Sequence, residues 1–180
     1  MTYHALVNEG RKRLLKAGQG EQAAQLLMVE LCSLKDINLY MVMDEEADEQ
    51  IQTDYLEGIH LMEKGSPLGY VLGYEWFYGY RFTVNGNVLI PRPETEELVA
   101  LVLGLFDDHF ADRDHVNVFD VGTGSGAIAI SLSLEEPKMD VIASDISKEA
   151  LDVAYENNKQ LNGRVSFIEG SMLEPFIDRD

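Results

Sequence analysis

The sequence predicts an α/β protein in which a helical N-terminal part precedes the first strands of a parallel sheet. Two observations carry this prediction. Apolar residues recur at helical spacing through residues 1–65, whereas residues 116–168 alternate between short β-branched runs and helical patterns. A strand–helix–strand–helix–strand order is typical of a parallel, doubly wound sheet. An aromatic and β-branched stretch at residues 76–90 separates the two parts.

The first 75 residues are interpreted as one helical domain. We expect helices over residues 4–17, 21–34 and 50–64, a short apolar piece at 36–43, and a short helix after Ser66-Pro67. The acidic run at residues 44–49 is interpreted as a solvated loop or helix start. His4 and His60 have no histidine or carboxylate at metal-ligand spacing, so no metal site is predicted.

Residues 76–92 are expected to form a β-hairpin that links the two domains. Asn85-Gly86 lies between two runs rich in aromatic and β-branched residues, and Asn-Gly is a strong hairpin signal. Arg92 follows, held between Pro91 and Pro93. From the sequence, this arginine is placed equally well to reach a ligand or an internal carboxylate.

The stretch that predicts a binding site begins at residue 116. An apolar strand ends in Gly122, Gly124 and Gly126, and an Ala/Ile-rich helical pattern follows. Such glycines let the backbone turn sharply and let a ligand approach closely. Free N–H groups at the helix start favour an electron-rich or anionic group. Asp145 ends the next apolar run, where an acid can accept hydrogen bonds from ribose hydroxyls. We interpret the stretch as a site for a nucleoside-bearing cofactor.

The glycine spacing leaves the cofactor open. Gly122-x-Gly124-x-x-Ala127 satisfies the dinucleotide fingerprint. Gly122-x-Gly124-x-Gly126 is the pattern of class I S-adenosylmethionine (SAM) methyltransferases. The position of the motif, well inside the chain, counts against a dinucleotide. A purely structural turn, with Asp145 capping the next helix, is the remaining alternative.

Composition narrows the class of protein. The 180 residues carry a formal net charge of −18, which repels phosphate backbones and argues against nucleic-acid binding. No apolar run reaches the roughly 20 residues that span a bilayer, and the N-terminus does not have the pattern of a signal peptide. Cys32 is the one cysteine, which excludes an intrachain disulfide. We expect a cytoplasmic protein without membrane contact.

Three segments together resemble the HemK/PrmC family, SAM-dependent methyltransferases that modify the glutamine of the Gly-Gly-Gln motif in peptide chain release factors. The Ile-Pro-Arg-Pro-Glu-Thr-Glu segment is the most specific of them. The segments are Pro67-Leu68-x-Tyr70-Val71-Leu72-Gly73, Ile90-Pro91-Arg92-Pro93-Glu94-Thr95-Glu96 and Asp120-Val121-Gly122-Thr123-Gly124-Ser125-Gly126-Ala127-Ile128-Ala129.

The resemblance implies a helical domain at residues 1–75 that helps engage the release factor, a hairpin linker at 76–92, and the N-terminal part of a Rossmann-like class I methyltransferase domain at 93–180. It implies SAM as cofactor and a release factor as protein partner. The methionine end of SAM would lie along Gly122, Thr123, Gly124, Ser125 and Gly126. Asp145 would hold the ribose, and Met172 would lie beside the adenine.

One family motif is absent. The family's catalytic Asn-Pro-Pro-Tyr, which accepts hydrogen bonds from the glutamine amide, does not occur in these 180 residues and is expected to lie beyond Asp180. We therefore assign no catalytic residue and expect an inactive fragment, about the first two-thirds of such an enzyme. In the family's sheet the strand at residues 116–121 is central, so we expect an exposed strand edge here that promotes self-association.

Two other function classes are compatible with the sequence. A methyltransferase acting on nucleic-acid amino groups uses a related Asn/Asp-Pro-Pro-Tyr motif, although the net charge argues against it. A non-catalytic adaptor with a degenerate nucleotide-binding fold is the second. A dehydrogenase would require binding of NAD(H) rather than SAM.

Overall fold

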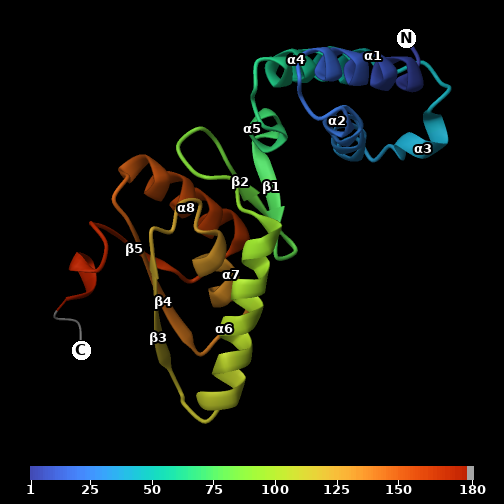
Figure 1. Ribbon diagram of the computed structural model, residues 1–180. Helices are drawn as coiled ribbons and strands as arrows, with labels where there is room; N and C mark the ends of the chain where they lie inside the picture. Colours follow the sequence, from blue (N-terminus) through green and yellow to red (C-terminus); the bar gives the residue numbers. More distant parts are fainter. Residues whose placement is uncertain (178–180) are drawn as a thin grey trace. The chain divides into compact units, whose positions relative to one another are not determined.

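The computed structural model describes residues 1–177 and contains two compact units, Met1–Leu72 and a second that begins at Gly73 (Figure 1). The first unit is helical, as predicted. Its helices are α1 (Tyr3–Lys16), α2 (Gln22–Ser33), α3 (Leu39–Val42), α4 (Glu49–Glu63) and α5 (Leu68–Leu72).

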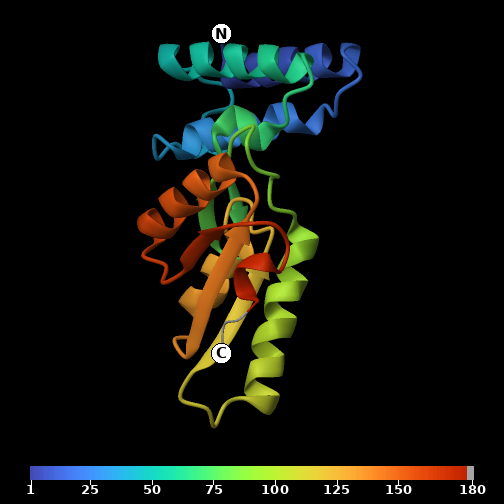
Figure 2. The same ribbon diagram turned by 90° about the vertical axis from the view of Figure 1, so that its left-hand side faces the viewer.

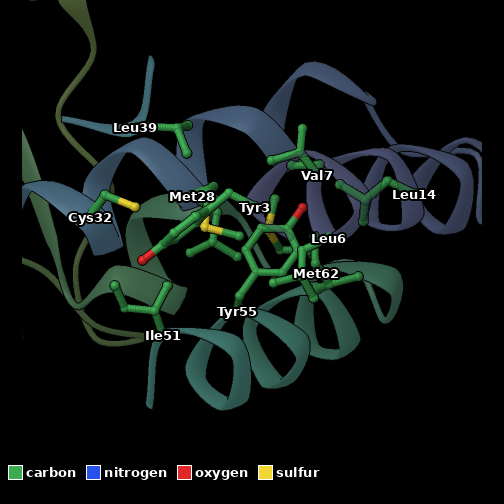
Figure 3. Close-up of a cluster of buried hydrophobic side chains, with 13 residues drawn as sticks. Tyr3, Leu6, Val7, Leu14, Met28, Cys32, Leu39, Ile51, Tyr55 and Met62 are labelled. Carbon is green, nitrogen blue, oxygen red and sulfur yellow. The ribbon is translucent and has the colours of Figure 1, made fainter. Parts of the chain in front are cut away.

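The core of the first unit lies where α1, α2 and α4 pack together. Leu6 and Leu14 of α1 and Tyr55 of α4 are among its fully buried side chains (Figure 3). Ile59 of α4 lies in the same cluster. The acidic run before α4 acts as a helix start: Asp48 Oδ1 accepts hydrogen bonds from the first-turn N–H groups. This local capping agrees with the interpretation of that run.

The second unit begins with a hairpin and continues into an α/β layer. Its elements are β1 (Tyr74–Phe77), β2 (Tyr80–Thr83), η1 (Pro93–Thr95), α6 (Glu96–His109), β3 (Val116–Val121), α7 (Ala127–Glu135), β4 (Met139–Asp145), α8 (Lys148–Leu161), β5 (Ser166–Glu169) and η2 (Glu174–Phe176).

Two predictions concern the last residue of the sequence, Asp180. Asp180 closes the predicted methyltransferase segment at 93–180, and the catalytic motif is expected to follow it. Asp180 lies outside the described residues. The segment boundary and the position of the motif therefore stay predictions.

The hairpin is present, but the predicted turn at Asn85-Gly86 is wrong. The chain reverses at Tyr78 and Gly79, whose φ angles are +51° and +78°. Positive φ at both central positions suits the twist of a two-residue hairpin. The Tyr78 N–H donates to Glu96 Oε1 of α6 at 2.9 Å, so a residue distant in sequence stabilises this turn. Asn85 forms a separate turn after β2, accepting from the Asn87 N–H.

The parallel sheet has the order β3-β4-β5, and its strands lie side by side in both views (Figures 1 and 2). Register pairs Val121 with Ser144, so the ends of β3 and β4 meet at one edge. Val141 and Ala143 of β4 are buried in the core that α6 and α7 also line. The predicted fold class is therefore confirmed: an α/β unit with three parallel strands follows a helical unit.

We predict that Tyr55 and Gly10 limit the stability of the first unit. The Tyr55 hydroxyl is buried and has no hydrogen-bond partner among the described residues, and burial raises the pKa of Tyr55 strongly. A Cβ at Gly10 would overlap this hydroxyl. Gly10→Ala should therefore lower the free energy of unfolding by about 1–3 kcal/mol through overpacking. Urea unfolding monitored by circular dichroism measures the change.

Tyr55→Phe is the matched test of the same contact. Because it removes a buried hydroxyl that lacks a partner, it should leave the stability unchanged or raise it by about 1 kcal/mol. Gly10→Ala should also cost less in the Tyr55→Phe background than in the wild type. Equal costs in both backgrounds would show that the hydroxyl does not limit the packing.

Candidate functional site

The loop between β3 and α7 follows the glycine pattern seen in the sequence. Gly122, Gly124 and Gly126 have φ angles of +79°, +55° and +81°, a region that side chains with a Cβ rarely adopt. A Cβ at Gly126 would lie 2.7 Å from Ile130 Cδ1, so this glycine serves packing. A Cβ at Gly122 or Gly124 would meet nothing within 4 Å. These two glycines therefore present bare main chain to open space.

Most N–H groups of this loop bond inside the protein, which corrects the expectation that they are free. The N–H groups of Gly122 and Thr123 donate to the Ser144 carbonyl at 2.8 and 2.9 Å. The Gly124 N–H donates to Asp145 Oδ2 at 2.9 Å. Residues at the end of β4 thus hold the loop in place, and its anion-binding capacity is largely used.

Gly126, the residue before α7, also bonds inside the protein. The Gly126 N–H donates to the Thr123 carbonyl at 2.9 Å. The Ala129 N–H, in the first turn of α7, bonds to the carboxylate of Asp120. Thr123 Oγ1 donates to Asp120 Oδ2 at 2.7 Å. A carboxylate at the end of β3, not predicted as a site residue, therefore lies beside the glycine loop.

Asp145 lies at the loop, as its position after the second strand predicted. Its second oxygen, Oδ1, accepts from the Ser147 N–H at 3.0 Å. Each carboxylate oxygen has two acceptor sites, so both oxygens keep capacity for a ligand donor. A hollow of about 490 Å³ is lined by Gly122, Asp145 and Met172, together with Val121, Ile146, Gly170, Ser171 and Leu173. Three of the predicted site residues thus share one hollow.

A second hollow, of about 160 Å³, lies on the other side of the loop. Residues 122–125 line one wall, and Leu89, Arg92 and Thr95 line the other with Phe77 of β1. Gly122 belongs to both hollows. An elongated ligand that crosses the loop at Gly122 would have one end in each, which brings Thr123, Gly124 and Ser125 beside its second end.

The charge at the loop is negative. Burial raises the pKa of Asp120 above its ordinary value, and the nearby Asp145 carboxylate adds to the rise. Two carboxylates beside the loop, with most of the N–H donors already bonded, disfavour a pyrophosphate. The same arrangement favours a ligand that carries positive charge, because a cation would relieve the repulsion between the acids.

Asn157 of α8 is a fully buried residue of this region that the sequence analysis did not identify. Its Oδ1 accepts from the Thr83 N–H at 2.7 Å, and its Nδ2 donates to the Thr83 and Ser125 carbonyls at 3.0 and 2.9 Å. One side chain therefore ties the hairpin to the glycine loop. An asparagine inside a helical pattern gives no sign of such a role.

Residues 1–177 contain neither a candidate metal site nor a candidate membrane-spanning helix. No group of three or more histidine, cysteine or acidic residues is placed there to hold a metal ion. No helix in that range is both long enough and apolar enough to cross a membrane.

Two family models match parts of this chain, one in each unit. Residues 112–178 match a family model described as a methyltransferase domain. With the parallel order β3-β4-β5 and the glycine loop after β3, the second unit is the N-terminal part of a class I methyltransferase domain. Residues 5–73 match the model of the PrmC N-terminal domain. The chain belongs to the HemK/PrmC family.

Curated relatives agree with this assignment. Release factor glutamine methyltransferase of Bacillus cereus is 43% identical over 91% of this chain and 57% of its own length. The protein of that name from Bacillus subtilis is 43% identical over 91% of this chain and 57% of its own length. The protein of that name from Staphylococcus aureus is 32% identical over 99% of this chain and 62% of its own length. The chain thus spans about three-fifths of the length of these relatives.

The methyltransferase assignment also decides the cofactor that the glycine spacing left open. The cofactor of this domain is SAM, and SAM fits the electrostatics of the loop. Its sulfonium and ammonium groups are cations, whereas the pyrophosphate of a dinucleotide would face Asp120 and Asp145.

We predict that Asp120 gives the ligand-free protein a characteristic pH dependence. Because the folded-state pKa is raised, ionised Asp120 costs stability above that pKa, and the cost disappears as pH falls toward the ordinary value of 3.8. Asp120→Asn removes this titration. The free energy of unfolding of the variant, relative to the wild type, should therefore increase as pH rises above about 4 and level off once pH exceeds the raised pKa.

Urea unfolding at several pH values measures this difference. Asp152→Asn, which neutralises an exposed carboxylate on α8, is the matched control. A relative stability of Asp120→Asn that is independent of pH, or that falls as pH rises, would contradict the prediction.

Proposed function

We propose that the whole protein is a SAM-dependent methyltransferase that modifies the glutamine side-chain amide in the Gly-Gly-Gln motif of peptide chain release factors. The names of the curated relatives support this substrate. In this proposal the helical unit helps engage the release factor, and the second unit holds the cofactor. Because release factors act in translation, the protein works in the cytoplasm, where the buried Cys32 stays a reduced thiol.

The observation that carries the proposal is the arrangement at the glycine loop. Gly122 and Gly124 face open space, and Asp145 lies between the loop and the larger hollow. We assign the adenosine to that hollow, with Asp145 accepting from the ribose hydroxyls and Met172 beside the adenine. Residues 122–126 then lie along the methionine end, which extends into the smaller hollow.

The cofactor supplies an electrophilic methyl group on its sulfonium. An amide nitrogen is a poor nucleophile, so positioning and electrostatics must provide much of the rate. The residues of this chain bind and orient the donor. The Asn-Pro-Pro-Tyr motif that would position the glutamine amide is absent from the 180 residues, and in this proposal it follows Asp180 in the whole protein. We therefore assign cofactor binding, and not methyl transfer, to the chain as given.

We predict that the chain binds S-adenosylhomocysteine and that Gly124→Asp abolishes or weakens this binding at least about tenfold, equivalent to about 1.4 kcal/mol. The new Cβ meets no protein atom within 4 Å, so the added carboxylate projects to where the ligand should lie. Isothermal titration calorimetry measures the dissociation constant.

Gly18→Asp is the matched control for this substitution. Gly18 also has a positive φ, +74°, and open space at its Cβ, but it belongs to the helical unit. It should leave the affinity unchanged. Equal affinities of the wild type and Gly124→Asp would refute the assignment of the loop. A rise in melting temperature with NAD(H) but not with S-adenosylhomocysteine would favour a dehydrogenase instead.

We also infer that the chain as given self-associates through the outer edge of β3. Among the described residues β3 pairs only with β4, and Phe119 on it is 42% exposed. An unpaired apolar strand edge promotes association. Light scattering should show a mass that rises with protein concentration, and Phe119→Lys should shift the population toward monomer. A constant monomer mass for the wild type at high concentration would refute this inference.

A further inference from the structure

The smaller hollow beside the glycine loop has one charged residue in its lining, Arg92. Thr95 also lines this hollow. Leu89 and Ile128 are among its apolar lining residues. Residues 122–125 of the glycine loop also line this hollow. A ligand group in this hollow therefore meets a single cation, together with apolar residues and the hydroxyl residues Thr95, Thr123 and Ser125.

The backbone at Arg92 is held firmly. Pro91 and Pro93 flank it, and its carbonyl accepts a hydrogen bond from the Thr95 N–H at 2.9 Å. Within residues 1–177 its guanidinium has no ion pair and no hydrogen bond to a side chain. The sequence left two partners open for this arginine, and no internal carboxylate in that range pairs with it. In a chain with 32 acidic residues, this leaves the cation available to a ligand.

Several other possible anion-binding groups at the loop are occupied. The N–H groups of Gly122 and Thr123 bond to Ser144, and that of Gly124 bonds to Asp145. The Gly126 N–H bonds to the Thr123 carbonyl. Arg92 is the charged residue in the lining of the smaller hollow, and its charge complements that of an anionic group.

The methionine end of SAM carries one ammonium and one carboxylate. The two charges need opposite partners, and the loop provides them on different elements. Asp120 lies at the end of β3, at the glycine loop, and Arg92 precedes η1 in the other wall of the hollow. A guanidinium binds a carboxylate through two parallel hydrogen bonds, a geometry that a lysine ammonium does not reproduce.

We propose that Arg92 binds the carboxylate of the methionine end of the cofactor and so determines which way round that end lies in the hollow. This rests on the proposed function only in taking the cofactor to be SAM. The role belongs to the Pro91-Arg92-Pro93 segment, which follows the hairpin and not the glycine loop. The cofactor site therefore extends beyond the nucleoside-binding turn into the segment before α6.

The test compares a ligand that has the amino-acid end of the cofactor with one that does not have it. S-adenosylhomocysteine has the carboxylate, whereas 5′-methylthioadenosine has the same thioether-linked adenosine without the amino-acid end. Both ligands are titrated calorimetrically against the full chain. Arg92→Gln should weaken the binding of S-adenosylhomocysteine about 10- to 100-fold. The same variant should change the affinity for 5′-methylthioadenosine by less than about twofold, because this ligand has no carboxylate to pair with the arginine.

Two variants complete the series. Arg92→Lys keeps the charge without the paired hydrogen bonds, so its affinity for S-adenosylhomocysteine should lie between those of the wild type and Arg92→Gln. Arg113→Gln removes an equal charge from an exposed position before β3, at the opposite end of that strand from the loop. It should leave both affinities unchanged.

Three other outcomes would overturn the proposal. Equal weakening of both ligands by Arg92→Gln would overturn the proposal, because the arginine would then act on the shape of the site. Unchanged affinity for S-adenosylhomocysteine would also overturn it and leave the cofactor site itself intact. Failure of the wild type to bind either ligand would refute the cofactor site, and the proposal with it.

Discussion

The site depends on one constraint, the closure of the glycine loop against the end of β4. Register pairs Val121 with Ser144, so the chain leaves β3 beside the residues that end β4. The Ser144 carbonyl then accepts two N–H groups of the loop, and the Asp145 carboxylate accepts a third. Gly122 and Gly124 have positive φ in this loop, a region that residues with a Cβ rarely adopt. Bare main chain beside an acid follows directly from this pairing.

The same closure determines the electrostatics of the site. Loops of this type are often described as anion-binding because of their free N–H groups. Here those donors are largely bonded within the protein, and the Asp120 carboxylate lies beside the loop, where it accepts from Thr123 Oγ1. The loop therefore suits a ligand with cationic groups, and a separate cation, Arg92, is the charge available for an anionic group. A zwitterionic amino-acid end matches that division of charge.

Comparison of sequence and structure separates local from distant causes. Strand and helix order, the glycine loop and the position of Asp145 follow from residue patterns within short stretches, and all were predicted. The hairpin turn was assigned to Asn85-Gly86 by a local rule, but Glu96 of α6 stabilises the turn at Tyr78 instead. Asn157 was missed because its three bonds reach Thr83 and Ser125, far from it in the chain.

The sequence by itself determined the α/β class, the helical first unit, the glycine turn and the acid that follows the second strand. These depend on periodicity and on conformations that only certain residues adopt, and both are local properties. Tertiary structure alone decided which N–H groups are bonded, that Asp120 is partly buried, and that Arg92 faces a hollow rather than a carboxylate. Those outcomes depend on strand register and on contacts between distant segments, which local residue patterns do not specify.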